Sequence, residues 1–326
     1  MEKRKKVLVC PLNWGLGHAT RCVPIIRRLV SEGHEVVIVG DGYPLSFLQK
    51  QFPQLRSIEV PSYPITYSKG NSQIWKFLGL IPKILIGIKK EHRWLDELLD
   101  KEHFDQVISD NRFGLWNKKT HSIYITHQVM IKMPKGLKWL EPIVYKLHRH
   151  YIDQYNTCWI PDREADGGLS GDLSHKYPVP PNAKFIGTLS RFDKFTEIEP
   201  NTEYQTIVIL SGVEPQRSIF EKRMVDKFKD TTHKTLILQG KPAEDVRIEK
   251  IRQIDLISHL NDEKFVAILK GCKEIICRAG YSTVMDLDTL QVLNKARFYP
   301  TPGQTEQEYL AEYLCSRATG LEPVAR

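Results

Sequence analysis

Short runs of apolar, mostly β-branched residues alternate along this chain with longer stretches in which apolar residues recur every three or four positions. Such runs are typical of buried strands in a parallel sheet, and the longer spacing is typical of helices with one apolar face. In the first half the predicted strands are 7–10, 35–39, 105–109, 122–126 and 157–160, and the clearest helix is 19–32, which Gly33 ends. This alternation predicts a parallel sheet that is covered by helices.

The pattern is interrupted between residues 167 and 181, where glycine and proline are frequent, and then it begins again. The second set of predicted strands is 206–210, 235–238, 274–277 and 295–299, and the predicted helices are 216–229, 262–270, 282–290 and 304–316. We therefore predict an α/β protein with two Rossmann-like, doubly wound domains, residues 1–190 and 191–326. Ligands of such sheets bind at the carboxyl ends of the strands, so a cleft between the two domains is the expected site.

The composition and net charge of the chain indicate which class of protein it belongs to and which binding partners are expected. The 326 residues are 41% hydrophobic and 26% charged, which is typical of a folded globular chain rather than a disordered or polytopic membrane protein. A net charge of +8 favours anionic partners, whereas the dispersed lysines and arginines include no recognition motif for nucleic acid. The six cysteines form no Cys-x-x-Cys pair and no apolar stretch reaches the roughly 20 residues that span a bilayer, so we expect a cytoplasmic protein.

The strongest local motif is Asn-Trp-Gly-Leu-Gly-His-Ala-Thr-Arg at 13–21, between the first predicted strand and the first helix. Gly15 and Gly17 allow a ligand to approach the backbone, and free N–H groups at a helix start favour negative charge. His18 lies in this turn and can accept a proton near neutral pH. Thr20 stands where a dinucleotide motif has its third glycine, which disfavours an NAD site. The alternative is a tight turn in which His18 only caps the helix.

Three turns in the second half have the same strand, turn and helix setting. The first contains Ser211, Gly212 and Arg217, whose guanidinium suits phosphate. The second, Arg-Ala-Gly-Tyr-Ser-Thr-Val-Met-Asp at 278–286, offers hydroxyls and a carboxylate. The third, Pro-Thr-Pro-Gly-Gln-Thr-Glu-Gln-Glu at 300–308, offers amide and carboxylate groups that suit sugar hydroxyls. Taken singly, each is equally typical of an ordinary loop before a helix.

Together, and in this order, the four motifs resemble glycosyltransferases of the GT-B fold, nearest to the MurG-like group (glycosyltransferase family 28-like). That group includes the enzyme that adds N-acetylglucosamine to a polyprenyl-linked peptidoglycan precursor, and plastid galactolipid synthases. The resemblance spans nearly the whole chain. It implies an inverting hexosyltransferase, without metal or other cofactor, that moves a sugar from a nucleotide-diphosphate sugar to a lipid-linked or cell-envelope glycan acceptor. UDP-N-acetylglucosamine is an example of the donor that it implies.

The resemblance also implies roles for single residues. Gly15, Gly17 and His18 would face the acceptor and the reacting centre, and His127, which begins an imperfect match to a His-Glu-Gln element of the group, would lie on the same side. The donor side would comprise Arg191, Ser211, Gly212, Arg217, Gly280, Ser282, Thr283, Asp286, Gln304, Gln307 and Glu308. Asp286 matches a residue that binds ribose, and Gln307 with Glu308 matches a pair that binds the donor sugar and usually has two amides.

The residues leave two questions open. His18 is the expected general base for the acceptor hydroxyl, but Asp110, at the end of a predicted strand, is a rival base. The alternative is that Asp110 has a structural role, as a carboxylate at the end of a strand that binds a neighbouring turn. The reaction is also open, because a sugar-nucleotide 2-epimerase of the same fold, or a non-catalytic nucleotide-sugar-binding protein, would need the same donor residues.

A stretch at 74–90 mixes apolar residues with lysines. It is a candidate for peripheral contact with an anionic membrane, at the inner face of the cell membrane, where it would deliver a lipid-linked acceptor. The alternative is a core helix whose lysines reach solvent. Residues 148–150, His-Arg-His, are expected on a solvated helix face. GT-B chains commonly finish with a helix that crosses back to the first domain, and the chain's end at Arg326 leads us to expect a shortened second domain.

Overall fold

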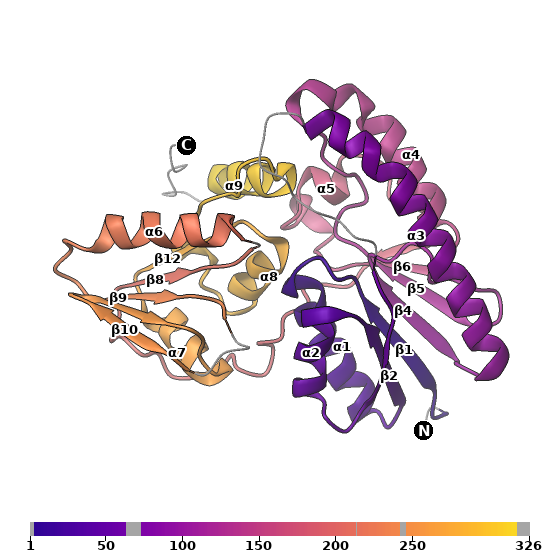
Figure 1. The fold of residues 1–326 in the computed structure, drawn as a ribbon, viewed down its shortest axis with the longest axis horizontal. Coiled ribbons are helices and arrows are strands. Elements are labelled where there is room, and N and C mark those ends of the chain that lie inside the picture. Colours follow the sequence, from indigo (N-terminus) through magenta and orange to yellow (C-terminus); the bar gives the residue numbers. More distant parts are fainter. Residues whose placement is uncertain (1–2, 63–72, 213, 242–245, 318–326) are drawn as a thin grey trace. The chain divides into compact units, whose positions relative to one another are not determined.

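The computed structural model describes residues 3–62, 73–212, 214–241 and 246–317, and the chain divides into two compact units. Unit 1 comprises residues 1–131 and 139–189, and unit 2 comprises residues 132–138 and 190–326. Each unit is built on its own sheet with parallel strands, so the prediction of two α/β sheets is confirmed (Figure 1). The predicted boundary assigned 132–138 to the first domain. In the structure this segment joins unit 2, where the Thr305 hydroxyl donates to the Lys132 carbonyl at 2.8 Å.

The sheet of unit 1 has seven strands in the order β3-β2-β1-β4-β5-β6-β7, and all the described pairs are parallel. The strands are β1 (Lys6–Pro11), β2 (Glu35–Gly40), β3 (Arg56–Glu59), β4 (Gln106–Asp110), β5 (His121–Ile125), β6 (Thr157–Ile160) and β7 (Ala183–Phe185). The chain runs outward from β1 to β3 and then returns to place β4 on the other side of β1. The loops after β1 and β4 therefore diverge, which is where doubly wound sheets bind ligands.

Helices cover both faces of this sheet, which explains why its strands are continuous apolar runs. Val7 and Val9 pack on one face under α1 (Leu16–Ser31) and α2 (Gly42–Gln51). Leu8 and Cys10, which alternate with them, pack on the other face against α3 (Gln73–Lys101). The remaining helical segments of this part of the chain are η1 (Lys135–Leu140), α4 (Glu141–Ile152), η2 (Ala165–Gly167) and α5 (Asp172–His175).

Several details of unit 1 differ from the sequence prediction, which did not include β3, β7 or α2. Helix α1 begins at Leu16 rather than at 19, because Gly15 has a φ of +81° and makes the turn by itself, so Gly17 and His18 lie in the first helical turn. The stretch 74–90 is part of the 29-residue helix α3, whose side chains 73–81 lie outside the described residues. As expected, none of the described helices is long and apolar enough to cross a membrane. His148 is buried and lies 3.1 Å from the Tyr124 hydroxyl, so 148–150 is not a wholly solvated face.

Unit 2 has six strands in the order β10-β11-β9-β8-β12-β13. They are β8 (Thr206–Ile209), β9 (Thr235–Leu238), β10 (Ile248–Ile251), β11 (Ile254–Ile257), β12 (Glu274–Cys277) and β13 (Ala296–Phe298). Among the described strand pairs of unit 2, only the pair of β10 with β11 is antiparallel. The helical segments are α6 (Gln216–Phe228), α7 (Asp262–Gly271), α8 (Tyr281–Thr289), η3 (Leu293–Lys295) and α9 (Thr305–Arg317). The strand order reverses between β8 and β12, so the loops after these two strands flank the expected binding point of this sheet.

Candidate functional site

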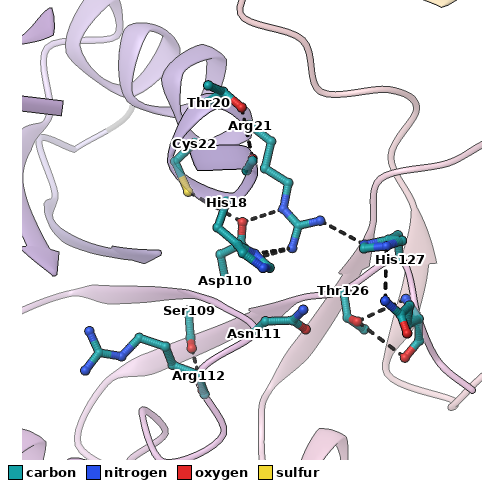
Figure 2. A network of polar contacts seen from close by, with 12 residues as sticks. His18, Thr20, Arg21, Cys22, Ser109, Asp110, Asn111, Arg112, Thr126 and His127 are labelled. Carbon is teal, nitrogen blue, oxygen red and sulfur yellow. Dashed lines mark hydrogen bonds and ion pairs between the residues drawn. The ribbon is translucent and has the colours of Figure 1, made fainter. Parts of the chain in front are cut away.

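His18 and Asp110 meet at the carboxyl edge of the first sheet. Asp110 is the last residue of β4, and His18 lies in the first turn of α1, just after β1. Because β1 and β4 are neighbours, residues 92 positions apart in sequence come together, and the Nδ1 atom of His18 lies 2.9 Å from Oδ1 of Asp110 (Figure 2). This is the point at which the strand order of unit 1 reverses.

Arg21 holds the carboxylate from the other side. Its Nε donates to Oδ2 of Asp110 at 2.5 Å, and its Nη2 donates to Oδ1 (Figure 2). Burial alone would raise the pKa of Asp110, which has no exposed surface, but the charges of Arg21 and His18 and their hydrogen bonds outweigh burial and hold that pKa well below its usual range. Asp110 is therefore ionised at neutral pH and acts only as a hydrogen-bond acceptor.

Nδ1 of His18 lies within hydrogen-bond distance of two groups, Oδ1 of Asp110 at 2.9 Å and Nη2 of Arg21 at 3.0 Å. In the tautomer whose proton is on Nδ1, the ring donates to the ionised carboxylate and its lone pair is on Nε2. The His18 side chain keeps 12% of its surface exposed, and its Nε2 has no protein partner among the described residues. This arrangement prepares Nε2 to accept a proton from a bound hydroxyl group, with Asp110 positioned to stabilise the resulting imidazolium.

His127 extends this network away from the surface. Nη1 of Arg21 donates to Nδ1 of His127 at 2.9 Å, and the His127 side chain is buried. The structure thus brings His18, Asp110 and His127 together through Arg21, to which the sequence motif assigned no role. The available signal was its spacing, since positions three apart share one side of a helix and Arg21 follows His18 by three.

Gly15, at the start of this helix, borders open space. Apart from its chain neighbours, no atom of the described residues lies within 4 Å of where a Cβ would stand, although the positive φ of Gly15 already disfavours other residues. Gly17 lies one position before His18, and its carbonyl accepts a hydrogen bond from the Thr20 hydroxyl at 3.0 Å. The backbone before His18 is consequently accessible, as the approach of a ligand requires.

A second polar cluster surrounds Asp286 in unit 2. Its Oδ1 accepts a hydrogen bond from the Ser190 hydroxyl at 2.5 Å. Burial raises the pKa of Asp286 to about 7, although the charge of Arg191 and the Ser190 hydrogen bond act in the opposite direction. Arg191 also pairs with Asp262, with 3.3 Å between Nη1 and Oδ1. Of the donor residues expected from sequence, Arg191 and Asp286 therefore lie together, and Ser190, which precedes Arg191 in the Gly-Thr-Leu-Ser-Arg stretch at 187–191, was given no role.

The two loops that flank the reversal in unit 2 are open. Ser211 and Gly212 are exposed after β8, and apart from the chain neighbours no atom of the described residues lies within 4 Å of a Cβ built on Gly212 or on Gly280, the N-cap of α8. In the first turn of α8 the hydroxyls of Ser282 and Thr283 are half-buried and have no protein partner among the described residues. Free hydroxyls and N–H groups at a helix start suit an anion such as a phosphate.

Three other expected donor residues are turned toward the protein. Arg217 is buried, and its guanidinium donates to Glu214 at 2.7 Å and to Glu221 at 2.8 Å, so it is not free for phosphate. Oε1 of Gln307 accepts from the Thr301 N–H at 2.9 Å.

Glu308 behaves in the same way, with 3.0 Å between its Oε1 and the Gly303 nitrogen. These two side chains brace the loop before α9. The Nε2 amide of Gln307 is still without a protein partner in the described part of the chain, and Gln304, at the end of this loop, is half-buried.

One Asp-x-Asp triplet, the pattern that holds a metal in some other glycosyltransferase folds, occurs at Asp286-Leu287-Asp288. It lies inside α8, where residues two apart point about 200° away from each other around the helix axis. Within the described ranges, no three His, Cys, Asp or Glu side chains are grouped so as to hold a metal ion. The triplet is therefore not arranged as a metal site.

Comparison with known proteins places this geometry in context. No family model matches the chain. Two uncharacterized glycosyltransferases of Methanosarcina acetivorans are similar to it, one 20% identical over 320 residues (93% of this chain, 81% of the relative) and the other 22% identical over 329 residues (95% and 81%).

Solved structures are similar over nearly the whole chain. The glycotransferase of kitacinnamycin has a TM-score of 0.64 at 13% identity, covering 97% of this chain and 85% of that one. The calicheamicin glycosyltransferase CalG4 has a TM-score of 0.60 at 11% identity, covering 97% and 84%, and LpCGTa, solved with UDP, has 0.58 at 13%, covering 95% and 83%. The chain therefore has the fold of GT-B glycosyltransferases. A MurG of Acinetobacter baumannii and a putative UDP-N-acetylglucosamine 2-epimerase of Listeria monocytogenes both give 0.52, so this likeness does not single out a subgroup.

Proposed function

We propose that this chain is an inverting, metal-independent glycosyltransferase that moves a sugar from a nucleotide-diphosphate sugar to a hydroxyl group. The observation that carries the proposal is the His18 imidazole, whose Nδ1 faces an ionised Asp110 and whose Nε2 has no protein partner among the described residues. An epimerase acting on the donor alone has no acceptor hydroxyl for Nε2 to deprotonate. The fold, shared with glycosyltransferases of several kinds, supports the same class of reaction.

The proposed reaction is a single displacement. Nε2 of His18 takes the proton of the acceptor hydroxyl as its oxygen attacks the anomeric carbon, and the bond from that carbon to the diphosphate breaks with its electron pair. Attack from the side opposite the leaving group inverts the configuration. Asp110 stabilises the imidazolium, and it stays ionised because Arg21 stays paired with it. His18 is thus the base in this proposal, and Asp110 is the residue that orients it.

Unit 2 would hold the donor. The hydroxyls of Ser282 and Thr283, with the start of α8 and the loop at Ser211 and Gly212, would take the diphosphate and stabilise its charge as it leaves. Asp286 would accept hydrogen bonds from ribose in its ionised form, in place of the Ser190 bond.

We propose uridine as the base of this donor. The sequence resemblance supports this choice, as does the UDP bound to LpCGTa, a structure of the same fold. The resemblance to the MurG-like group supports a lipid-linked molecule or a cell-envelope glycan as the acceptor.

The test combines binding and transfer. Thermal shift with a panel of nucleotide-diphosphate sugars identifies the donor, since a ligand at 100 times its Kd stabilises by about 2.7 kcal/mol. Transfer to candidate hydroxyl acceptors is then followed with wild type and with His18→Ala, which should lower turnover by about 10² to 10⁴ and leave donor affinity unchanged.

His103, whose side chain is 76% exposed, provides the matched control His103→Ala. Wild-type turnover in folded His18→Ala would contradict the proposed base. Conversion of the donor without any acceptor, with a change at the C2 position, would instead identify an epimerase.

A further inference from the structure

Arg278, the residue that follows β12, is a buried arginine that is paired with no carboxylate among the described residues. Only 6% of its surface is exposed. Removing a charged side chain from water is unfavourable unless an opposite charge or a full set of hydrogen bonds compensates for it. The surroundings of Arg278 provide this compensation only in part.

The hydrogen bonds of Arg278 all go to backbone oxygens. Its Nη1 donates to the carbonyls of Tyr299 at 3.0 Å and Pro300 at 2.9 Å, and its Nη2 donates to the carbonyl of Gln216 at 3.2 Å. Its Cζ lies 4.1 Å from the centre of the Phe220 ring, which is a favourable cation–π contact. The Nε atom is buried and has no hydrogen-bond partner in the part of the chain that the structure describes. These neutral groups bind the guanidinium without neutralising its charge.

Two further cations of α6 lie around the tyrosine whose carbonyl Arg278 binds. Nζ of Lys227 donates to the Tyr299 hydroxyl at 3.0 Å, and Cζ of Arg223 lies 5.4 Å from the centre of the Tyr299 ring. Burial, together with the charge of Arg223, lowers the pKa of Arg278 to about 10, so the guanidinium is still charged at neutral pH. The neighbouring charges therefore add to the positive charge of Arg278.

The guanidinium joins three loops at the carboxyl edge of the second sheet. Arg278 itself follows β12, Tyr299 and Pro300 follow β13, and Gln216 is the first residue of α6, which comes after the loop that follows β8. Strands β8, β12 and β13 are neighbours in the sheet, and the strand order reverses between β8 and β12. The buried charge consequently lies at the place where a sheet of this kind binds its ligand.

Helix α8 begins next to this charge, with Gly280 as its N-cap. Its first N–H groups and the half-buried hydroxyls of Ser282 and Thr283 suit an anion. The charge of Arg278 reinforces the partial positive charge of the helix start. An anion bound there would supply the negative charge that the described residues do not provide for Arg278. A diphosphate, which carries more than one negative charge, fits this requirement.

We propose that Arg278 is a positioning residue for the diphosphate of the donor. Its hydrogen bonds hold the three loops in place, and its fixed charge attracts the diphosphate to the start of α8 and stabilises it as it leaves. It acts through these loops and through its electric field rather than by touching the phosphates, because its Nε is buried. This inference rests on the proposed function, which supplies the diphosphate, and no role was assigned to Arg278 from the sequence.

Two variants separate the charge of residue 278 from its hydrogen bonds. Arg278→Lys and Arg278→Gln can each still donate to a backbone carbonyl, but only the lysine is charged. Calorimetry measures the affinity of both for UDP, UMP and uridine. Arg278→Gln should weaken UDP binding by about tenfold or more and change uridine binding by less than about twofold, because a fixed charge acts on the phosphates and not on the nucleoside. Arg278→Lys should stay within about threefold of wild type for UDP.

A second measurement does not depend on the base of the nucleotide. Inorganic pyrophosphate should raise the melting temperature of wild type and of Arg278→Lys, and should raise that of Arg278→Gln much less. The matched control is Arg297→Gln, which removes an arginine of the same sheet whose side chain is 48% exposed and pairs with Glu274 at 2.8 Å. This control should bind pyrophosphate and UDP as wild type does.

Several results would overturn the inference. Equal UDP affinity in Arg278→Gln and Arg278→Lys would remove the role of the charge, and equal losses for UDP and uridine would reduce Arg278 to a structural brace. Either result, with UDP bound by wild type, leaves the proposed function standing. Wild type that binds neither pyrophosphate nor any nucleotide-diphosphate sugar would contradict both.

A measurement on wild type keeps the inference testable even where Arg278→Gln does not fold. The Nε–H resonance of Arg278 is identified in the NMR spectrum by its absence from the spectrum of Arg278→Lys. Addition of pyrophosphate should shift this resonance and leave that of Arg297 in place. An unchanged Arg278 resonance at a pyrophosphate concentration that stabilises the protein would contradict the proposed position of the anion.

Discussion

In unit 1 the residues around His18 hold one another in place. Asp110 and Arg21 have 0% and 3% of their surfaces exposed, and their hydrogen bonds fix the position of the His18 imidazole. In unit 2, by contrast, Gln307 and Glu308 are half-buried and bind the backbone of their own loop, and nearby hydroxyls have no described partner. The first arrangement suits chemistry, since a base has to be held in one orientation before the substrate arrives. The second suits binding, since its groups can exchange protein partners for those of a ligand.

The largest stability effect should come from breaking the locked network. Arg21→Met leaves the fully buried Asp110 without its guanidinium, and we expect the free energy of unfolding to fall by about 3 to 5 kcal/mol. The matched change in unit 2 is Arg217→Met, whose partners Glu214 and Glu221 have side chains that are 54% and 23% exposed. Glu214 can turn to water and Glu221 keeps its hydrogen bond from Gln239, so a smaller loss of about 1 to 2 kcal/mol is expected. Urea unfolding of both variants measures the difference, and equal losses would contradict the contrast.

Lowering the pH should change the contributions of Asp110 and Asp286 to the stability of the folded state in opposite directions. The pKa of Asp110 is lowered by Arg21, so its stabilising effect is present above the ordinary carboxyl pKa and is lost as the pH falls through the lowered value. The pKa of Asp286 is raised to about 7, so the folded state binds more protons than the unfolded state between about pH 4 and 7, and stability falls as the pH rises through that range.

Asp286→Asn isolates this second effect. The amide cannot ionise, so the variant should melt at a higher temperature than wild type at pH 8 and show little difference at pH 5. Thermal unfolding at both pH values provides the measurement. A melting temperature difference that is the same at pH 5 and pH 8 would show that Asp286 does not titrate with a raised pKa.

The smallest expected effect concerns Glu308. In Glu308→Gln the new amide oxygen can still accept the Gly303 N–H, so melting temperature should change little. The variant restores the pair of amides that the resemblance associates with the donor sugar, and we expect relative kcat/KM for two donor sugars to change about three- to tenfold. Tyr313→Phe, on the same helix α9, is the control. An unchanged ratio in folded Glu308→Gln would indicate that residue 308 braces the loop and does not select the sugar.

The parallel sheets could be predicted because their strands are apolar on both faces, which leaves a strong pattern in the sequence. Strands β10 and β11 were missed for the opposite reason. β10 contains Glu249 and Lys250 on an exposed edge, and β11 contains Asp255, which is buried and accepts a hydrogen bond from the Tyr204 hydroxyl at 2.7 Å. Because that hydrogen bond joins residues 51 positions apart in the sequence, no local sequence pattern predicts it.

Some contacts of the candidate site could also be predicted from the sequence, and others could not. His18 and Asp110 stand out because each follows an apolar strand, and the neighbouring positions of β1 and β4 bring them together. The pairing of Arg217 with Glu214 and Glu221 involves positions three and four apart on a helix, so it could have been expected from spacing. The inward turn of Gln307 depends on the path of the loop before α9, which the sequence does not specify.

Residues 132–138 have a practical consequence for anyone who divides this protein. Their partners are on α9, where the Thr305 hydroxyl donates to the Lys132 carbonyl and the Lys132 ammonium lies 4.2 Å from the centre of the Tyr309 ring. A fragment that begins at residue 190 would contain all the strands of the second sheet and yet lack this segment. A chimera that exchanges unit 2 as a whole therefore needs three junctions, near residues 132, 139 and 190. A single cut at the boundary predicted from the sequence would separate α9 from residues 132–138, which contact it.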